Sequence, residues 1–364
     1  MSDIVRRHYE LYPYPHYPLL ASVRRCDTYA ANLSALWCRF NGELPSPEAR
    51  RILIAGCGSF SPYPFALANP DTPITALDLS ASSLRRARLH CLLHGQRHVT
   101  FREGDLRDPC AIDGAFGLID SFGVLHHLED PLAGMRALAA HLCEGGILRV
   151  MVYSRYTRRE EESVRRALRI LGVRDPATAR RLLKRARKGS RLRRFLEASE
   201  EVSGTAGLAD ALLHPCVTTY RIDEFMELVA ASGLQPLLFA HRHALPDVEE
   251  EIARIRALEG QKRSPGNFVL YLGRGTKGGC GTEEDSLFLL NPALSGAVRS
   301  LRPGALHIPP RLGHHNPPLR GGDRRFLRRF LRPVGSDALT REEREAALSF
   351  AEKLFLLQYR RSPL

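Results

Sequence analysis

The stretch RILIAGCGS, residues 51–59, decides the fold. It begins with a short apolar run at 51–55, of the length expected for a buried strand, and passes directly into Gly56-Cys57-Gly58. Glycines between a strand and a helix let the backbone approach a ligand closely, and the helix N-terminus that follows favours negative charge. A plain tight turn would explain two glycines equally well, because Ser61 replaces the third glycine of the dinucleotide-binding fingerprint.

Outward from this stretch, short strands alternate with helices. Helical periodicity is expected up to about residue 94 after a cap at 80–83, and again over 131–142, where Gly145-Gly146 would end the helix. Such alternation predicts an α/β fold with a Rossmann-like, doubly wound sheet of seven strands. The predicted strands are 51–55, 75–79, 99–103, 116–122, 147–153, 234–240 and 267–273.

Two carboxylates follow the second and third predicted strands. Asp78 lies 22 residues after Gly56, where an acidic side chain in a doubly wound fold can accept hydrogen bonds from ribose hydroxyls. Asp105 stands in Gly104-Asp105-Leu106, where its carboxylate could accept from an adenine amine and Leu106 could form an apolar wall. The alternatives are a solvated acid at a helix N-terminus and an ordinary Gly-Asp turn.

The fourth predicted strand ends in DSFGVLHHL, residues 120–128. Ligands bind at strand C-termini in such sheets, so Ser121 and Gly123 are candidate cofactor contacts. Two adjacent histidines face different ways and make a poor metal pair. His126 is the candidate general base, because an unperturbed imidazole titrates near neutrality. A structural or helix-capping role remains the alternative.

These motifs, ILIAGCGS, ALDLS, EGDLRD and FGLIDSFGVLHHLEDP, occur in the order and spacing that resemble the class I S-adenosylmethionine (SAM)-dependent methyltransferases. The resemblance covers 50–153 strongly and 217–273 more loosely. It implies that Gly56 and Gly58 lie beside the methionine portion of SAM, Asp78 on the ribose and Asp105 with Leu106 at the adenine. It also implies a sulfonium near 123–126 and a final antiparallel strand at 267–273.

Two positions depart from the family pattern, which often has an acidic residue at Ala55 and a glycine at Phe60. A bacterial subgroup with AGCG in this loop is more similar, and it shares an upstream Tyr-Glu-x-x-Pro-Tyr-Pro segment with residues 9–15. Each proline in this segment favours extended or turn geometry before it. The phenols could cover the cofactor cleft or flank the sulfonium, or the segment could simply pack on the surface. The candidate residues are Tyr9, Tyr12 and Tyr14.

The net charge of +13 is concentrated in one place. Residues 155–194 hold sixteen basic and four acidic side chains, within a predicted helical insertion at 154–216. This insertion follows the fifth strand and would lie beside the acceptor as a lid. Its arginines could bind RNA phosphates, but aromatic residues for base stacking are nearly absent, and a solvated helical face explains the charge as well.

The organisation predicted from sequence has four parts: an N-terminal arm or lid at 1–49, a SAM-binding domain at 50–153 and 217–273, the basic insertion, and a C-terminal unit at 282–364. A capping box at Thr340 and Glu343 predicts a helix to about residue 359, and apolar positions suggest a small separate core that could support a homodimer. The eight cysteines include no CxxC pair, which favours a reduced, cytoplasmic protein. We expect no metal site, membrane span or secretion signal.

The expected function is methyl transfer from SAM to an unidentified acceptor, most simply a small molecule. Positioning supplies much of the catalysis of such an in-line displacement, so no distinctive catalytic motif is required. An RNA or protein methyltransferase and a non-catalytic SAM-binding module remain alternatives. A nicotinamide-dependent dehydrogenase is disfavoured by Ser61 and by the segments at 104–106 and 125–128.

Overall fold

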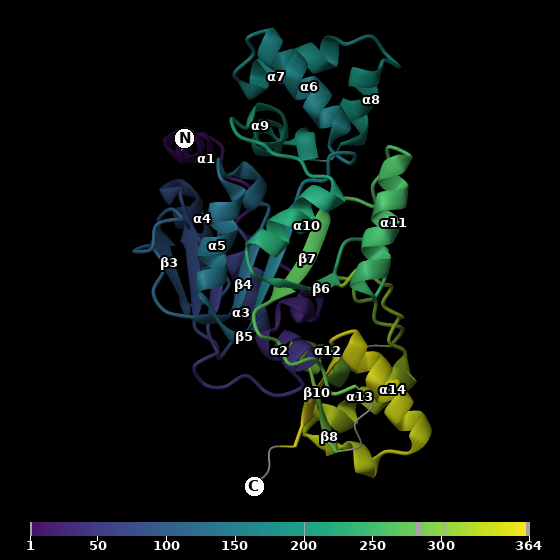
Figure 1. Cartoon of the computed structure of the whole chain (residues 1–364). Helices are drawn as coiled ribbons and strands as arrows, with labels where there is room; N and C mark the ends of the chain where they lie inside the picture. The colour runs from purple at the N-terminus through teal and green to yellow at the C-terminus, as the bar shows by residue number, and fades with distance from the viewer. Residues whose placement is uncertain (1, 200, 282–284, 302, 362–364) are drawn as a thin grey trace.

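The computed structural model describes residues 2–199, 201–281, 285–301 and 303–361. Its centre is a seven-stranded sheet with the order β3-β2-β1-β4-β5-β7-β6 (Figure 1). Strands β1 to β5 pair in parallel, whereas β7 is antiparallel to both of its neighbours. The predicted doubly wound sheet and its antiparallel final strand are confirmed. The strands are β1 (Ile52–Ala55), β2 (Ile74–Asp78), β3 (Val99–Glu103), β4 (Phe116–Phe122), β5 (Leu142–Val152), β6 (Gln235–Phe239) and β7 (Phe268–Gly273).

Alternation along β1 explains why helices cover both faces. Ile52 and Ile54 join one apolar cluster, whereas Leu53 and Ala55 join the other, because successive side chains of a strand point to opposite faces. The first cluster packs beneath α2 (Leu33–Asn41), α3 (Pro62–Ala68) and α4 (Ala81–Leu93). The second packs beneath α5 (Pro131–Ala140), α10 (Ile222–Ala231) and α11 (Val248–Gly260).

The prediction that Gly145-Gly146 ends the helix after residue 131 is wrong. Helix α5 ends at Ala140, and β5 begins at Leu142, so both glycines lie inside an eleven-residue strand. A Cβ on Gly145 would lie 3.0 Å from the Trp37 ring, and a Cβ on Gly146 would lie 2.7 Å from the Cys143 carbonyl oxygen. Close packing therefore accounts for the two glycines.

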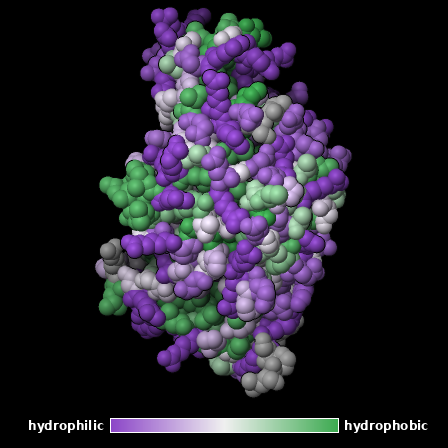
Figure 2. Space-filling view, turned by 90° about the vertical axis from the view of Figure 1, so that its left-hand side faces the viewer, coloured by the Kyte–Doolittle hydropathy of each residue, from purple (hydrophilic) through white to green (hydrophobic). Residues whose placement is uncertain are grey.

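The insertion forms a helical lid above the carboxyl edge of the sheet, at the top of Figure 1. It consists of α6 (Arg159–Ile170), α7 (Pro176–Arg185), α8 (Arg191–Ala198), η3 (Glu201–Ser203) and α9 (Thr205–Leu213). Val164, Leu183 and Leu208 belong to an apolar cluster within the lid. Figure 2 shows hydrophilic side chains crowding this end of the molecule, with apolar groups between them.

The N-terminal segment is more helical than its prolines predict. Helix α1 spans Ser2–Leu11 and contains Tyr9, whereas the chain is irregular from residue 12 onward until η1 (Arg25–Ala31). Helix α1 packs against α4. The segment therefore begins as a helix beside the sheet and crosses its edge as an extended strap.

The C-terminal unit packs on the first helical layer. Tyr29 of η1 joins Phe288 and Phe355 in one buried cluster, and the Asn291 amide donates to the Tyr29 carbonyl. The predicted helix to residue 359 is too long, because α14 ends at Glu352 and the chain turns into a strand. The elements are β8 (Ser286–Leu290), η4 (Pro292–Leu294), α12 (Ser295–Arg299), α13 (Gly321–Arg328), η5 (Arg329–Leu331), β9 (Val334–Gly335), η6 (Ser336–Ala338), α14 (Arg341–Glu352) and β10 (Leu356–Arg360).

Residues 282–284 and 362–364 of the predicted C-terminal unit lie outside the described residues. The boundary at 282 and the proposed homodimer through this unit stay predictions. Among the described helices, none is long and apolar enough to cross a membrane.

Candidate cofactor and acceptor site

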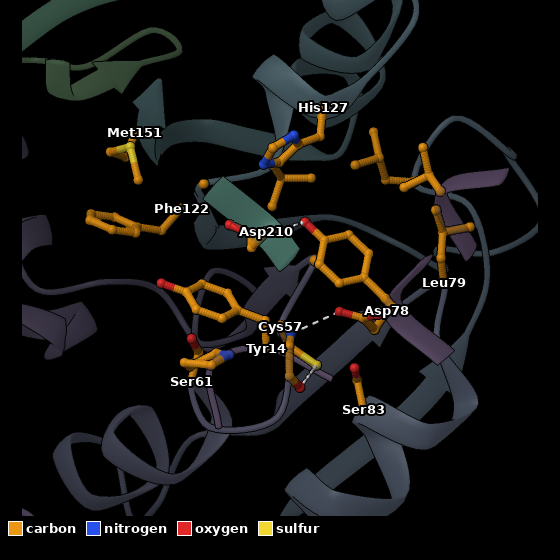
Figure 3. Close-up of a pocket in the computed structure, with 18 of the residues that line it drawn as sticks. Tyr14, Cys57, Ser61, Asp78, Leu79, Ser83, Phe122, His127, Met151 and Asp210 are labelled. Carbon is orange, nitrogen blue, oxygen red and sulfur yellow. Dashed lines mark hydrogen bonds between the residues drawn. The ribbon is translucent and has the colours of Figure 1, made fainter. Parts of the chain in front are cut away.

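One cavity of about 470 Å³ lies at the carboxyl ends of β1, β2 and β4, where ligands bind in open α/β sheets (Figure 3). The sheet edge forms one side, and the N-terminal segment and the lid form the others. The lining residues that sequence reasoning named are Tyr9, Tyr14, Gly56, Gly58, Asp78, Asp105, Leu106 and Gly123. Tyr12, Ser121 and His126 were also named, but they are not among the residues that line it.

The turn after β1 depends on its glycines. Gly56 and Gly58 have φ angles of +74° and +57°, which L side chains rarely adopt. A Cβ on Gly58 would lie 2.6 Å from the Tyr14 carbonyl oxygen, and one on Gly56 would lie 2.4 Å from a Val124 methyl. The Ser59 amide also donates to the Tyr14 carbonyl at 3.3 Å. The turn therefore holds the N-terminal strap directly over the cavity.

Replacing Gly58 with alanine should weaken SAM binding at least about tenfold, because the added methyl displaces the strap as well as straining the turn. Gly233→Ala is the matched control: Gly233 also has a positive φ, +76°, but a Cβ there would meet nothing within 4 Å. Calorimetric titration of both variants with SAM separates backbone strain from collision. Equal affinities for the two variants would contradict the role of the strap contact.

Asp78 ends β2 and is held in place by backbone donors. Its carboxylate accepts from the Gly58 amide at 2.7 Å and the Ser80 amide at 2.9 Å, so it connects the two loops of the cofactor side. Burial raises the pKa of Asp78 to about 6, although both amides act in the opposite direction. Ser80 also caps α4 by accepting from the Ser83 amide, as its position in the sequence predicts. A carboxylate fixed in this way is preorganised to accept from a diol.

Asp105 and Leu106 line the cavity after β3. Leu106 is buried and offers the predicted apolar wall. The Asp105 carboxylate is bound to Arg107, at 2.7 Å from a terminal guanidinium nitrogen. An adenine amine would therefore share this carboxylate with Arg107, a partner that the Gly-Asp-Leu pattern did not reveal.

Two predicted cofactor contacts separate at the end of β4, because Ser121 lies inside the strand and Gly123 lies just beyond its last residue. Gly123 lines the cavity with a φ of +82°, but Ser121 points into the core, fully buried. Phe122 takes the place expected for Ser121 and faces Met151 of β5 in Figure 3. Arg149 lies over the Phe122 ring and pairs with Asp120 at 2.5 Å, which fixes the strand end.

His127 lines the cavity, whereas the predicted base His126 does not. His126 is fully buried against Tyr153, with ring centroids 3.7 Å apart, and burial lowers its pKa well below the usual value. His127 Nδ1 lies 2.8 Å from the Cys216 carbonyl oxygen, which can only accept, so Nδ1 carries the proton. Burial lowers the pKa of His127 to about 4, so at neutral pH its Nε2 presents a lone pair.

Sequence reasoning missed four lining residues on this side: Tyr153, which directly follows β5, and Arg158, Glu201 and Asp210 of the insertion. Asp210 of α9 is buried and accepts from the Tyr9 hydroxyl at 3.0 Å, which joins the lid to α1. Arg158 pairs with Glu201 at 2.6 Å and lies over the Tyr153 ring. The one available sequence signal was a lone aspartate in the otherwise apolar helix TAGLADALL.

His127, Asp210 and His214 bring their potential ligand atoms within 4.8 Å of one another. Protonation argues against a metal ion there. His214 Nδ1 accepts from the Cys216 amide at 3.1 Å, so its Nε2 carries the proton, and neither nitrogen has a free lone pair. Two ligands then remain, fewer than the three or four that zinc sites use, and we assign no metal to this cluster.

Comparison with known proteins agrees with this geometry. Residues 53–148 match a protein family described as a methyltransferase domain. An uncharacterized protein of Synechococcus sp. is 32% identical over 253 residues, covering 66% of this chain and 61% of its own length. The ubiquinone biosynthesis O-methyltransferase of Xanthomonas campestris pv. campestris is 35% identical over 99 residues, which cover 27% of this chain and 41% of that enzyme. The chain thus spans about two fifths to three fifths of these relatives.

The fold extends beyond the matched segment. PKMT2 from Rickettsia typhi superposes with a TM-score of 0.57 at 14% identity, covering 95% of this chain and 78% of its own. Its complex with AdoHcy gives a TM-score of 0.55 at 13% identity, covering 95% of this chain and 77% of the PKMT2 chain. Residues 53–148 are thus similar to a methyltransferase domain, and the strand order and the glycine turn agree with that similarity.

Proposed function

We propose that this chain transfers the methyl group of SAM to a small-molecule acceptor bound beneath the lid. The observation that carries the proposal is the arrangement of the cavity at the carboxyl edge of the sheet. Its sheet side has the Gly56–Gly58 turn and the preorganised carboxylate of Asp78, and its other side is built from lid and N-terminal residues. A cofactor on the first side would face an acceptor on the second.

Asp78 would hold the ribose, Leu106 would pack on the adenine, and the glycine turn would receive the methionine portion. SAM supplies an electrophilic methyl group on a sulfonium. Gly123 leaves room at the end of β4, where its φ of +82° keeps the position free of a side chain. Phe122 and Met151 form an apolar wall beside it, which would exclude water from the reacting atoms.

A small acceptor fits better than a nucleic acid. The basic groups of α7 line a second hollow with Arg180, Arg181, Lys184 and Arg185, and it shares no lining residue with the cofactor cavity. Helix α7 lies at the far end of the lid from the sheet in Figure 1. The positive charge that suggested RNA therefore lies away from the cavity in which methyl transfer would occur.

Calorimetric titration of the full chain with SAM, AdoHcy and NAD tests the cofactor assignment. We expect micromolar or tighter binding of SAM and AdoHcy, about 8 kcal/mol of binding free energy, and none of NAD. NAD binding without SAM binding would refute the proposal and restore the dehydrogenase alternative.

A further inference from the structure

We propose that the acceptor end of the cavity is built to bind an aliphatic amine in its protonated form. This inference rests on the proposed function and names the acceptor class of that same site. It follows from the direction in which three polar residues that line the cavity beside Asp210, namely Tyr9, Tyr153 and His127, use their hydrogens.

The two tyrosines beside Asp210 have their protons engaged. Tyr9 donates to one carboxylate oxygen of Asp210 at 3.0 Å, and Tyr153 is 3.5 Å from the other, where it can donate. Both rings line the cavity. A phenol whose hydrogen is committed offers only lone pairs to a ligand, so each tyrosine acts toward the cavity as an acceptor.

His127 also presents a hydrogen-bond acceptor, and no donor, to the cavity. Its Nδ1 hydrogen is committed to the Cys216 carbonyl, and the lowered pKa keeps the ring neutral, which leaves a lone pair on Nε2. Figure 3 shows the ring of His127 pointing toward Asp210. The carboxylate itself, two phenol oxygens and one imidazole nitrogen therefore all present acceptors at one end of the cavity.

The balance of charge favours a cation. Arg158 lines the cavity, but the charge of its guanidinium is already compensated. The guanidinium pairs with Glu201 at 2.6 Å and lies 3.5 Å from Glu161. Fields from Arg158 and Arg165 oppose the effect of burial on the pKa of Asp210, but neither arginine forms an ion pair with Asp210 among the described residues. Asp210 is thus a buried carboxylate held by neutral hydroxyls.

A protonated amine matches both properties. An alkylammonium has three N–H donors and one positive charge, and the tyrosine ring faces add cation–π attraction. An alcohol brings one donor and no charge. A carboxylate or phosphate would place lone pairs against lone pairs and a negative charge beside Asp210. We therefore expect the site to bind an ammonium most tightly, an alcohol less tightly, and a carboxylate or phosphate least.

The chemistry balances with the groups present. The ammonium passes one proton to the Asp210 carboxylate, whose pKa burial raises. The freed nitrogen lone pair forms the new N–CH₃ bond as the S–CH₃ bond breaks, and that electron pair stays on sulfur as a neutral thioether. The product is an N-methylammonium, and the proton on Asp210 leaves to solvent when the cavity opens.

Three probes of similar size and shape test the polarity: n-butylamine, 1-butanol and butyrate, each titrated by ligand-observed NMR into full-length protein saturated with AdoHcy at pH 7. We expect n-butylamine to bind at least tenfold more tightly than 1-butanol, and butyrate to give no saturable signal. Comparable binding of all three probes, preference for butyrate, or no binding of n-butylamine at 10 mM would overturn the inference.

Two variants assign the effect to Asp210. Asp210→Asn should weaken n-butylamine binding at least tenfold and leave AdoHcy affinity within twofold, whereas Tyr9→Phe, which removes one acceptor oxygen, should give a smaller loss. Asp71→Asn, at an exposed turn, is the control and should change neither. If Asp210→Asn does not fold, the Tyr9→Phe result decides.

Loss of AdoHcy affinity in Asp210→Asn would show that the cofactor's own ammonium occupies this site and would overturn the inference. Failure of the unaltered protein to bind SAM or AdoHcy would instead count against the proposed function. The two failures are therefore distinguishable.

Discussion

Replacing Asp78 with alanine should weaken SAM binding by about 100-fold. The variant loses the acceptor for the ribose hydroxyls, and charge-assisted hydrogen bonds of this kind contribute roughly 1.5–3 kcal/mol each. It also leaves the Gly58 and Ser80 amides without the carboxylate that holds them at 2.7 and 2.9 Å. Calorimetry with SAM measures the change directly, and circular dichroism reports whether the fold persists.

Asp71→Ala provides a control for the Asp78 variant, because Asp71 is an exposed aspartate in the turn just before β2. It should bind SAM as the unaltered chain does. Asp78→Asn, which keeps one acceptor oxygen, should have a SAM affinity between those of Asp78→Ala and Asp71→Ala. If Asp78→Ala retained full affinity with a native spectrum, the ribose assignment would be wrong.

Replacing Arg149 with methionine should lower the free energy of unfolding by about 3–5 kcal/mol. Arg149 lies between the sheet and the first helical layer, over the Phe65 and Phe122 rings, and binds the Asp120 carboxylate at 2.5 Å. Burial opposes its charge, but Asp120 and Tyr271 together outweigh that effect and raise the pKa of Arg149. The variant leaves Asp120, whose side chain is only 2% exposed, without its cation.

Two companion variants isolate the buried charge. Arg102→Met breaks an exposed pair with Asp113 and should cost no more than about 1 kcal/mol. Adding Asp120→Asn to Arg149→Met should recover much of the loss, because the uncompensated charge disappears. Denaturant unfolding of the set measures these differences, and equal costs for Arg149→Met and Arg102→Met would contradict this account.

The cofactor side could be predicted from sequence because each of its parts is local. The glycine turn, Asp78 and Leu106 each follow directly from a strand, and parallel strands bring their ends to one edge. Asp105 lines the cavity, but its pairing with Arg107 depends on side-chain geometry within the loop.

Single-residue alternation explains most errors on this side. Ser121 and His126 each precede by one position the residue that reaches the cavity, Phe122 and His127 respectively. One residue of offset reverses the face of a strand and rotates a short 3₁₀ turn, here η2 (Leu125–His127), by about a third of a revolution. A sequence pattern therefore predicts which segment borders the cavity better than it predicts which residue of that segment lines it.

The acceptor side could not be predicted because it joins segments far apart in the chain. Tyr9 and Asp210 are 201 positions apart, and no spacing rule connects them. Their meeting depends on how the lid packs on α1. The same limit applies to the C-terminal unit, whose apolar residues looked like a separate core but pack with Tyr29 and the helices of the first layer.

The hydrogen bond from Tyr9 to Asp210 has a kinetic consequence. It ties two covers of the cavity, α1 and the lid, while the strap after α1 is bound to the glycine turn through Ser59. Neither α1 nor the lid can move away from the cavity without breaking the Tyr9–Asp210 hydrogen bond, and the strap cannot move without breaking its contact with the glycine turn. We therefore expect release of AdoHcy to be slower than the proposed methyl transfer, because the hydrogen bond between Tyr9 and Asp210 must break before the cavity opens.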